Sequence, residues 1–317
     1  MRIGVVGAGA VGGYFGSLLT LAGHEVTVLA RGEHLEAIRK RGLRVRSVRA
    51  GQPPREWVAW PRATDDAAGA GVQDLILFAV KSYDTEQAAQ AMAPWVGPDT
   101  SILCLQNGVE NEARLAALYG EDRVLPAVVY IGAERVAPGL IEHRARGEIV
   151  LGEPGGELSS RVDRLREVLA GAGIPVQMVP DIWAAKWEKF LFNVALNAAS
   201  ALTGATAERL VATPAPRWVF EASLREAQAV ALALGVGLDD GVVERVVRAA
   251  QTLPAVSSMA HDLAQGKPLE LESLNGYVVR EGRRLGLPTP VNATLYGLME
   301  VRQETPQRGQ AGLASNA

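Results

Sequence analysis

Cysteine is almost absent from this chain of 317 residues, because Cys104 stands alone. A single thiol excludes an intramolecular disulfide framework and a zinc site built from several cysteines, and it fits a reducing, cytoplasmic location. Cys104 falls within an apolar run, so we expect a buried and unreactive thiol. The four histidines have neither metal-site nor Ser/His/Asp spacing, so no metal is expected.

Aromatic residues make up only 5% of the chain, and 35 acidic residues outnumber 32 basic ones, which leaves a net charge of -3. Base-stacking platforms and a basic field for a phosphate backbone are both lacking, so nucleic acid is not an expected partner. Long hydrophobic runs are missing as well, and no membrane span is expected. Residues 1–6 lack the apolar region and cleavage site of a secretory signal.

The composition that remains is that of a soluble globular protein. Hydrophobic residues make up 48% of the chain and charged residues 21%. The length allows two domains, each with its own core.

The first thirty residues predict a strand, a helix and a second strand. Residues 2–6 are apolar, residues 14–22 have a helical pattern that ends at Gly23, and residues 25–29 are rich in β-branched side chains.

A glycine motif, Gly7-x-Gly9-x-x-Gly12, joins the first strand to the helix. The first glycine suits a tight turn, the second a close approach to a pyrophosphate, and the third close packing of helix on strand. Backbone N–H groups at the start of the helix would then face the anion. The motif predicts a dinucleotide site formed by Gly7, Gly9, Ala10, Val11 and Gly12.

Strands and helices continue to alternate, which predicts a parallel α/β sheet. The further predicted strands are residues 75–80, 102–105 and 124–129, with helices at residues 85–92 and 110–118.

The pattern changes after residue 129. Two strand-like runs, residues 140–143 and 148–151, are separated by residues 144–147 and predict an antiparallel pair at the sheet edge. Residues 159–170 then predict a capped helix.

Strand-like residues stop near residue 179, and helical periodicity takes over. We therefore predict a nucleotide-binding domain at residues 1–179, a helical domain at residues 180–302 and a frayed tail without function at residues 303–317. The predicted helices of the second domain are residues 182–202, 217–234, 240–251, 258–265, 272–285 and 291–301.

Arg31 follows the second predicted strand, where an NAD-binding fold would offer an acidic residue to the ribose hydroxyls. A guanidinium there can pair with the 2′-phosphate of NADPH, so NADPH is the expected cofactor. Glu33 could instead take the acidic role if the loop is displaced.

A polar stripe interrupts the otherwise apolar helix of residues 182–202. Lys189, Asn193 and Asn197 are spaced by four and share one face, to which Ser200 returns. Buried amides and ammonium groups are costly without partners, so this face lines a wet cleft or touches a ligand, unless it packs on another helix through internal hydrogen bonds. Lys186 is offset from the stripe and is expected to be solvated.

Lys189 suits the chemistry of hydride transfer to a carbonyl group. Its charge and proton would stabilise the developing alkoxide, and partial desolvation would lower its pKa toward the working pH. His261, beside Asp262, is a weaker alternative acid.

These features together resemble the ketopantoate reductase (2-dehydropantoate 2-reductase) family. The resemblance covers residues 1–302 and rests on the glycine motif, Arg31, residues 80–85, residues 106–110, Trp187-Glu188-Lys189 with Asn193 and Asn197, Ser257-Ser258-Met259, Glu270 and Asn275-Gly276. It implies a Rossmann-like doubly wound sheet followed by an all-α domain, and NADPH-dependent reduction of ketopantoate to (R)-pantoate for pantothenate and coenzyme A synthesis.

The resemblance also implies residue roles. Lys189 would be the general acid, and Glu270 would hold the substrate hydroxyl or the lysine and contribute to the cofactor site. Asn193 and Asn197 would bind the substrate, and Ser258 its carboxylate. Lys81 would reach the cofactor, and Asn107 would lie between nicotinamide and substrate.

One departure leaves the identity of the 2-oxo acid open. The family usually has an Arg-Thr-Glu-Ile-Asp-like run where this chain reads Lys267-Pro268-Leu269-Glu270-Leu271-Glu272. A reductase for another 2-oxo acid is therefore one alternative. A second alternative is a non-catalytic NADPH-binding sensor whose helical domain contacts a protein partner, although a sensor needs no proton donor. The sequence does not fix the oligomeric state, and a homodimer is an open expectation.

Overall fold

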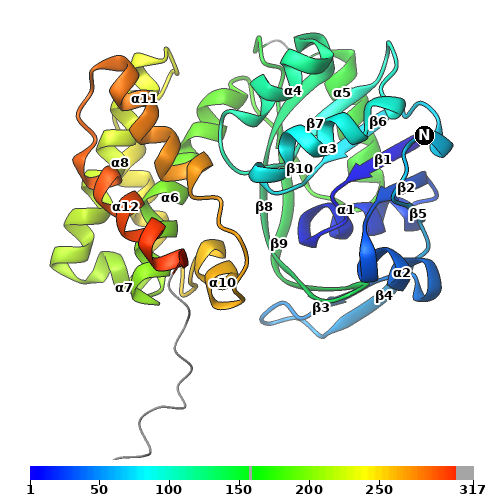
Figure 1. Cartoon of the computed structure of the whole chain (residues 1–317), viewed down its shortest axis with the longest axis horizontal. Coiled ribbons are helices and arrows are strands. Elements are labelled where there is room, and N and C mark those ends of the chain that lie inside the picture. The colour runs from blue at the N-terminus through cyan, green and yellow to red at the C-terminus, as the bar shows by residue number, and fades with distance from the viewer. Residues whose placement is uncertain (157–158, 305–317) are drawn as a thin grey trace, which may run out of the picture. The chain divides into compact units, whose positions relative to one another are not determined.

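The computed structural model describes residues 1–156 and residues 159–304, and Figure 1 draws it as a ribbon. The chain divides into two compact units, Met1–Lys186 and Trp187–Ala317, and the division falls inside one continuous helix, α6 (Ile182–Thr203). Of the predicted tail, residues 303–304 end the last helix, and residues 305–317 lie outside the described residues.

The first unit contains a ten-stranded mixed sheet. Its strands are β1 (Arg2–Val6), β2 (Glu25–Leu29), β3 (Leu43–Ser47), β4 (Arg55–Ala59), β5 (Arg62–Thr64), β6 (Leu75–Phe78), β7 (Ser101–Cys104), β8 (Val124–Ala137), β9 (Leu140–Leu151) and β10 (Val176–Met178). The neighbours β5-β2-β1-β6-β7-β8 pair in parallel throughout.

The order of this parallel part reverses at β1. From there the chain moves outward through β2 to β5 on one side, and through β6 and β7 to β8 on the other. This is the 3-2-1-4-5-6 order of a doubly wound dinucleotide-binding sheet, so the predicted Rossmann-like fold is confirmed. The loops that leave β1 and β6 lie at the point of reversal, where open α/β sheets bind ligands.

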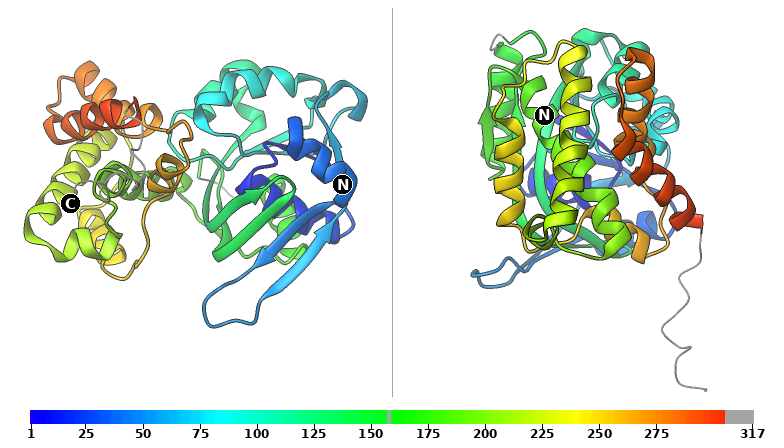
Figure 2. Two further views of the ribbon diagram at one scale, coloured as in Figure 1. Left: turned by 60° about the horizontal axis from the view of Figure 1, so that its bottom comes forward. Right: turned by 90° about the vertical axis from the view of Figure 1, so that its left-hand side faces the viewer.

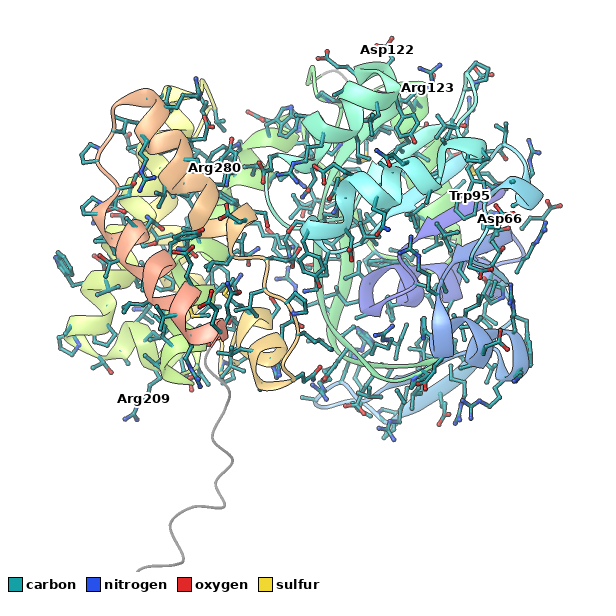
Figure 3. The ribbon with its side chains drawn as sticks, in the orientation of Figure 1. Asp66, Trp95, Asp122, Arg123, Arg209 and Arg280 are labelled. Atoms are coloured by element: carbon teal, nitrogen blue, oxygen red, sulfur yellow. The ribbon has the colours of Figure 1, made fainter. Side chains whose placement is uncertain are left out.

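Helices cover both faces of the parallel strands. They are α1 (Ala10–Leu21), α2 (Gly32–Arg41), α3 (Thr85–Ala91), α4 (Asn111–Tyr119) and α5 (Ser160–Gly171). Alternate side chains of β6 enter two different cores: Leu77 packs with α1, α2 and α5, and Phe78 with α3 and α4. Because both faces are covered, every side chain of β6 and β7 is buried. Trp95, labelled in Figure 3, is fully buried in the second of these cores.

The predicted hairpin of residues 140–143 and 148–151 is wrong. These residues form one strand, β9, which pairs antiparallel with β8. The turn lies earlier, at Gly139, and the glycine at 147 accompanies a β-bulge, since the register shifts opposite Tyr130 and Ile131. Beyond β9, β3 and β4 form a further hairpin, drawn in blue in the left view of Figure 2.

The second unit is helical in its described residues, which confirms the predicted all-α part. After α6 come α7 (Ala207–Ala212), α8 (Pro214–Ala233), α9 (Val242–Gln251), α10 (Ser258–Ala264), the π-helical turn η5 (Glu272–Gly276), α11 (Tyr277–Leu285) and α12 (Pro290–Glu304). Its core includes Phe190, Phe220, Leu224 and Val246. Within the described part of the chain, no helix has both the length and the apolar character that crossing a bilayer requires.

Candidate functional site

The glycine motif leaves β1 and leads directly into α1. Gly7 adopts φ +94°, and a Cβ there would lie 2.9 Å from the backbone of Ala79, so the turn after β1 lies against the segment after β6. A Cβ on Gly12 would lie 2.3 Å from the carbonyl oxygen of Gly7, so the helix can pack this closely only without a side chain. A Cβ on Gly9 would meet nothing within 4 Å, which leaves the backbone open on that side.

This geometry suits a pyrophosphate. Gly9 is the N-cap of α1, and Ala10 and Val11 begin the helix, whose first N–H groups have no partner within the helix. Such a terminus attracts anions through its N–H groups and its dipole. Gly7 therefore has the positive φ, Gly9 the open backbone and Gly12 the close packing that a dinucleotide loop requires.

Two basic residues lie in the loops on either side of the glycine motif. Arg31 follows β2 and is the N-cap of α2; its side chain is exposed, and Nη1 donates to Gln87 Oε1 at 3.3 Å. Glu33 is exposed in the first turn of α2. Lys81 follows β6 as the N-cap of a short 3₁₀ helix, Ser82–Asp84.

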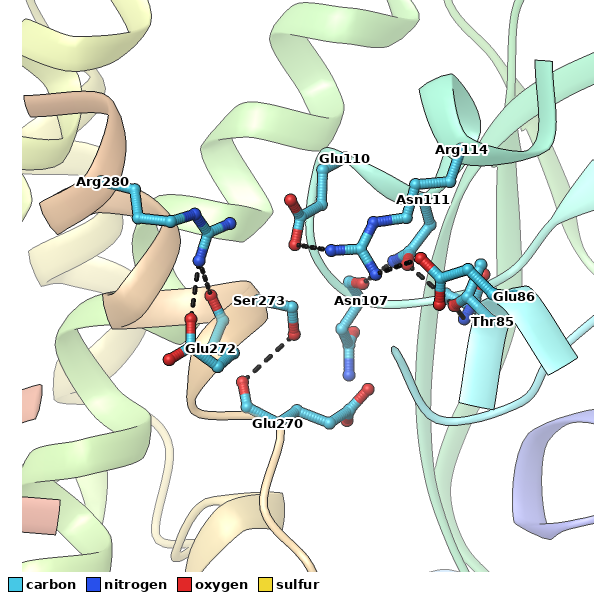
Figure 4. A network of polar contacts seen from close by, with 11 residues as sticks. Thr85, Glu86, Asn107, Glu110, Asn111, Arg114, Glu270, Glu272, Ser273 and Arg280 are labelled. Atoms are coloured by element: carbon cyan, nitrogen blue, oxygen red, sulfur yellow. Dashed lines mark hydrogen bonds and ion pairs between the residues drawn. The ribbon is translucent and has the colours of Figure 1, made fainter. Parts of the chain in front are cut away.

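The loop after β7 carries Asn107 and is fixed by a polar network. Gln106 Nε2 donates to Thr85 Oγ1 at 2.9 Å, and Thr85 Oγ1 donates to Asn111 Oδ1 at 3.1 Å. Asn111 Nδ2 donates to the carbonyl oxygen of Asn107 at 2.8 Å, and Figure 4 shows this part of the network. The loops after β6 and β7 are thereby joined, and Asn107 is held by its main chain.

The prediction that Lys186 is solvated is wrong. Its side chain is 4% exposed, and its Nζ lies 2.7 Å from Oε1 of the equally buried Glu112. Nζ also donates to the carbonyl oxygens of Gln106 and Ala127, both at 3.2 Å, so three partners match its three protons. Burial alone would lower the pKa of Lys186, but the charge and hydrogen bond of Glu112, together with Cys104, raise that pKa above its usual value.

Lys186 therefore anchors the first turns of α6 to the loop after β7. One of the two carbonyl groups that Lys186 binds is that of Gln106, the residue before Asn107. Cys104 is buried beneath, and burial raises the pKa of its thiol well above the usual value, which agrees with an unreactive cysteine.

The polar stripe on α6 changes in character along the helix. Lys189 and Asn193 are partly exposed, and Asn197 is 2% exposed. Ser200 is fully buried: its Oγ donates to the carbonyl oxygen of Ala205 at 2.8 Å and accepts from the N–H of Ser257 at 3.0 Å. Ser200 therefore has an internal structural role, whereas the side chains of Lys189 and Asn193 are only partly buried.

Adjacent serines at the start of α10 have different roles. Ser257 is the N-cap: its Oγ accepts from the N–H of Ala260 at 3.1 Å and donates to the carbonyl oxygen of Asn197 at 3.2 Å. Ser258 is exposed as the first residue of the helix. The cap thus joins α10 to α6 and leaves the Ser258 side chain exposed to solvent.

Glu270 precedes the π-helical turn η5 and is 8% exposed. Its carbonyl oxygen accepts from Ser273 Oγ at 3.1 Å, as Figure 4 shows. Within η5, Asn275 Nδ2 donates to the carbonyl oxygen of Val194 on α6 at 3.1 Å. The second unit therefore ties the segments that carry Ser258 and Glu270 to the helix that carries Lys189. A π-helical turn is frequent at functional sites.

No structural role was predicted for Glu112, Ser257 or His34, although Ser257 belongs to the Ser257-Ser258-Met259 run that carries the family resemblance. Each is a polar residue that is almost fully buried, with 3%, 3% and 6% of its surface exposed. The Ser257-Ser258 pair before a helical run was a capping signal for the first of the two serines. His261, the weaker alternative acid, is exposed on α10.

Comparisons with known proteins agree with this architecture. A family model described as ketopantoate reductase PanE/ApbA matches residues 3–156, and one described as ketopantoate reductase PanE/ApbA C terminal matches residues 181–303. The 2-dehydropantoate 2-reductase of Mesorhizobium japonicum is 36% identical, covering 98% of this chain and 99% of its own. The 2-dehydropantoate 2-reductase of Halobacterium salinarum is also 36% identical, over 96% of this chain and 99% of the relative.

Solved structures give the same result. The ketopantoate reductase of the PanE/ApbA family from Ralstonia eutropha JMP134 is 39% identical, with a TM-score of 0.87 over 96% of this chain and 99% of that one. D-Mandelate dehydrogenase also has a TM-score of 0.87, but at 22% identity it shows the fold alone. With both family models matched in order and relatives aligned over nearly their whole length, the chain belongs to the ketopantoate reductase family of oxidoreductases.

Proposed function

We propose that this protein catalyses the NADPH-dependent reduction of ketopantoate to (R)-pantoate. The observation that carries the proposal is the match, over nearly the whole chain, to relatives named 2-dehydropantoate 2-reductase. The accessible lysine and asparagine of α6 support it, because reduction of a carbonyl group needs a proton donor and polar groups that orient the substrate.

The cofactor site of the proposal lies in the first unit. NADPH, when bound, supplies the hydride. The open backbone of Gly7, Gly9 and Gly12 and the start of α1 would hold its pyrophosphate. Arg31 would pair with the 2′-phosphate, Lys81 would contribute positive charge, and Asn107 would face the nicotinamide end.

The proton and substrate chemistry of the proposal lies in the second unit. Lys189 would donate its proton to the carbonyl oxygen, where negative charge develops as the hydride arrives. Glu270 would accept a hydrogen bond from the resulting hydroxyl or orient the lysine, and it would also border the cofactor. Asn193, Asn197 and Ser258 would orient the 2-oxo acid, with Ser258 donating to its carboxylate.

The lysine is tested by the Lys189→Ala substitution. We expect turnover to fall by a factor of about 10² to 10⁴, because the transition state loses its proton donor and cation. The dissociation constant for NADPH, measured by fluorescence titration, should stay near the wild-type value. Turnover close to that of the wild type would remove Lys189 from the mechanism.

A reductase for another 2-oxo acid is the second candidate, and the altered run around Glu270 favours it. A panel of 2-oxo acids discriminates between the two, because the preferred acid has the highest kcat/KM. Cytoplasmic location and a homodimer remain separate expectations.

A further inference from the structure

His34 lies under the glycine motif, in the first turns of α2. It is 6% exposed, and its ring is held from both sides. Nε2 lies 2.6 Å from the carbonyl oxygen of Ala8, and Nδ1 lies 2.9 Å from the backbone nitrogen of Gly139. The ring therefore links the loop after β1 to the turn between β8 and β9.

These partners fix the protonation of the ring. A carbonyl oxygen can only accept, so Nε2 carries the proton and donates it to Ala8. The N–H of Gly139 can only donate, so Nδ1 must be a bare acceptor. His34 is thus a neutral imidazole in a single tautomer.

The bond to Ala8 also sets the direction of the next N–H group. The peptide that joins Ala8 to Gly9 is trans and planar, so its C=O and N–H point in opposite directions. With the carbonyl turned inward to His34, the N–H of Gly9 points away from the ring. Of the three glycines of the motif, only Gly9 has no neighbouring atom within 4 Å of a built Cβ.

We propose that His34 is a positioning residue for dinucleotide binding, which holds the Ala8–Gly9 peptide with its N–H toward the pyrophosphate. The inference rests on the proposed cofactor site and adds a residue that does not touch the ligand. His34 follows Arg31 by three residues, so one short segment supports both the pyrophosphate and the 2′-phosphate.

Protonation of Nδ1 would oppose this arrangement, because two N–H donors would then face each other at Gly139. Burial disfavours the protonated, positively charged ring, and the positive charge of Arg135 on β8 adds to this effect. Glu33 and Glu36 flank His34 on α2, and both are exposed.

Two substitutions separate the two bonds of the ring. In His34→Gln the amide nitrogen can still donate to Ala8, whereas in His34→Asn the shorter side chain reaches only Gly139, from whose N–H its amide oxygen accepts. We expect His34→Asn to raise the dissociation constants for NADPH and NADH by the same factor, about tenfold, since both contain the pyrophosphate. His34→Gln should stay within about threefold of the wild type.

His143 supplies the matched control. It is 1% exposed in the same unit, Nε2 donates to the carbonyl oxygen of Arg146 at 2.8 Å, and Nδ1 lies 3.0 Å from Ser47 Oγ. His143→Asn, whose shorter side chain cannot reach the carbonyl oxygen of Arg146, should therefore lower the unfolding temperature and leave the dissociation constants of both dinucleotides unchanged.

Fluorescence titration of the folded proteins gives a decisive result in each case. Tenfold weaker binding by His34→Asn alone, equal for both dinucleotides, supports the inference. Wild-type binding by His34→Asn overturns it and leaves the proposed function standing. If His143→Asn weakens binding as much as His34→Asn, the effect is a general loss of stability and the inference fails. If the wild-type protein binds neither dinucleotide, both the proposed function and the inference about His34 fail.

Discussion

Two lysines three residues apart on one helix have different environments. Lys189 is partly exposed, and Lys186 is buried against Glu112. The offset of Lys186 from the polar stripe predicted a solvated side chain, whereas Lys186 is the more buried of the two lysines. The burial of Lys186 could not be predicted, because its partner lies 74 positions earlier in the chain and meets it only in the folded protein.

Lys186→Met should lower the free energy of unfolding by about 3 to 5 kcal/mol, because it leaves the Glu112 carboxylate buried without a counterion. The double variant Lys186→Met/Glu112→Leu should recover most of this loss, since well-packed apolar residues can replace a buried ion pair. Urea unfolding measures both variants. A single variant within about 1 kcal/mol of the wild type would show that the pair contributes little.

Arg31 is the residue on which the preference for NADPH depends. Arg31→Ala should weaken NADPH binding by about tenfold or more and leave NADH binding nearly unchanged, because only NADPH has the 2′-phosphate. Fluorescence titration with both dinucleotides measures the two constants, and Arg39→Ala on the same helix is the control. Equal losses for both dinucleotides would contradict the assignment of the 2′-phosphate to Arg31.

Apolar elements with a clear periodicity were predictable from the sequence, whereas the strand β3, which is rich in arginine, was overlooked. The strand at residues 25–29 and the long helix α6 matched their predictions closely. β3 was overlooked although its buried Leu43 and Val45 alternate with exposed arginines, which is the period-2 signal of a strand. The strand β9 was divided in two because Gly147 resembles a turn, whereas its partner strand β8 makes it a bulge.

Gly147→Ala tests that bulge. Gly147 has φ +120°, and a Cβ there would lie 2.9 Å from Tyr14 Oη, so we expect a loss of about 2 to 3 kcal/mol in the free energy of unfolding. Gly23→Ala is the control, because its φ of +87° is also positive but its Cβ would meet no atom within 4 Å. It should cost only about 1 kcal/mol. If both variants lose the same free energy of unfolding, the contact with Tyr14 does not contribute to the cost of Gly147→Ala.

At the scale of the molecule, buried histidines should make stability depend on pH. Burial lowers the pKa of His34 and of His143, and in both rings a bond to a backbone carbonyl acts in the opposite direction. In the unfolded state the histidine side chains have a pKa of about 6.5. Below that pH the unfolded state therefore binds more protons than the folded state. The carboxyl group of Glu142 responds at lower pH, because hydrogen bonds from Arg46 and Arg144 lower its pKa.

The free energy of unfolding should accordingly be constant above a pH of about 6.5 and fall as the pH drops toward 5. The decrease is at most about 1.4 kcal/mol per pH unit for each histidine. Urea unfolding from pH 8 to pH 5 measures it, and His143→Gln should reduce the slope. A flat profile in the wild type would contradict the lowered pKa values. Burial also lowers the pKa of His24. Because His24 is present in both the wild type and the His143→Gln variant, it does not contribute to the difference between their slopes.

The most direct test of the proposed function is the rate of NADPH oxidation by the purified protein with ketopantoate, beside NADH and a panel of other 2-oxo acids. We predict that ketopantoate with NADPH gives the highest kcat/KM. A higher kcat/KM with another 2-oxo acid would contradict ketopantoate as the preferred substrate. The altered residues 267–272 around Glu270 would then be the first to test for a role in specificity. NADPH binding without oxidation of any substrate in the panel would contradict the catalytic role itself.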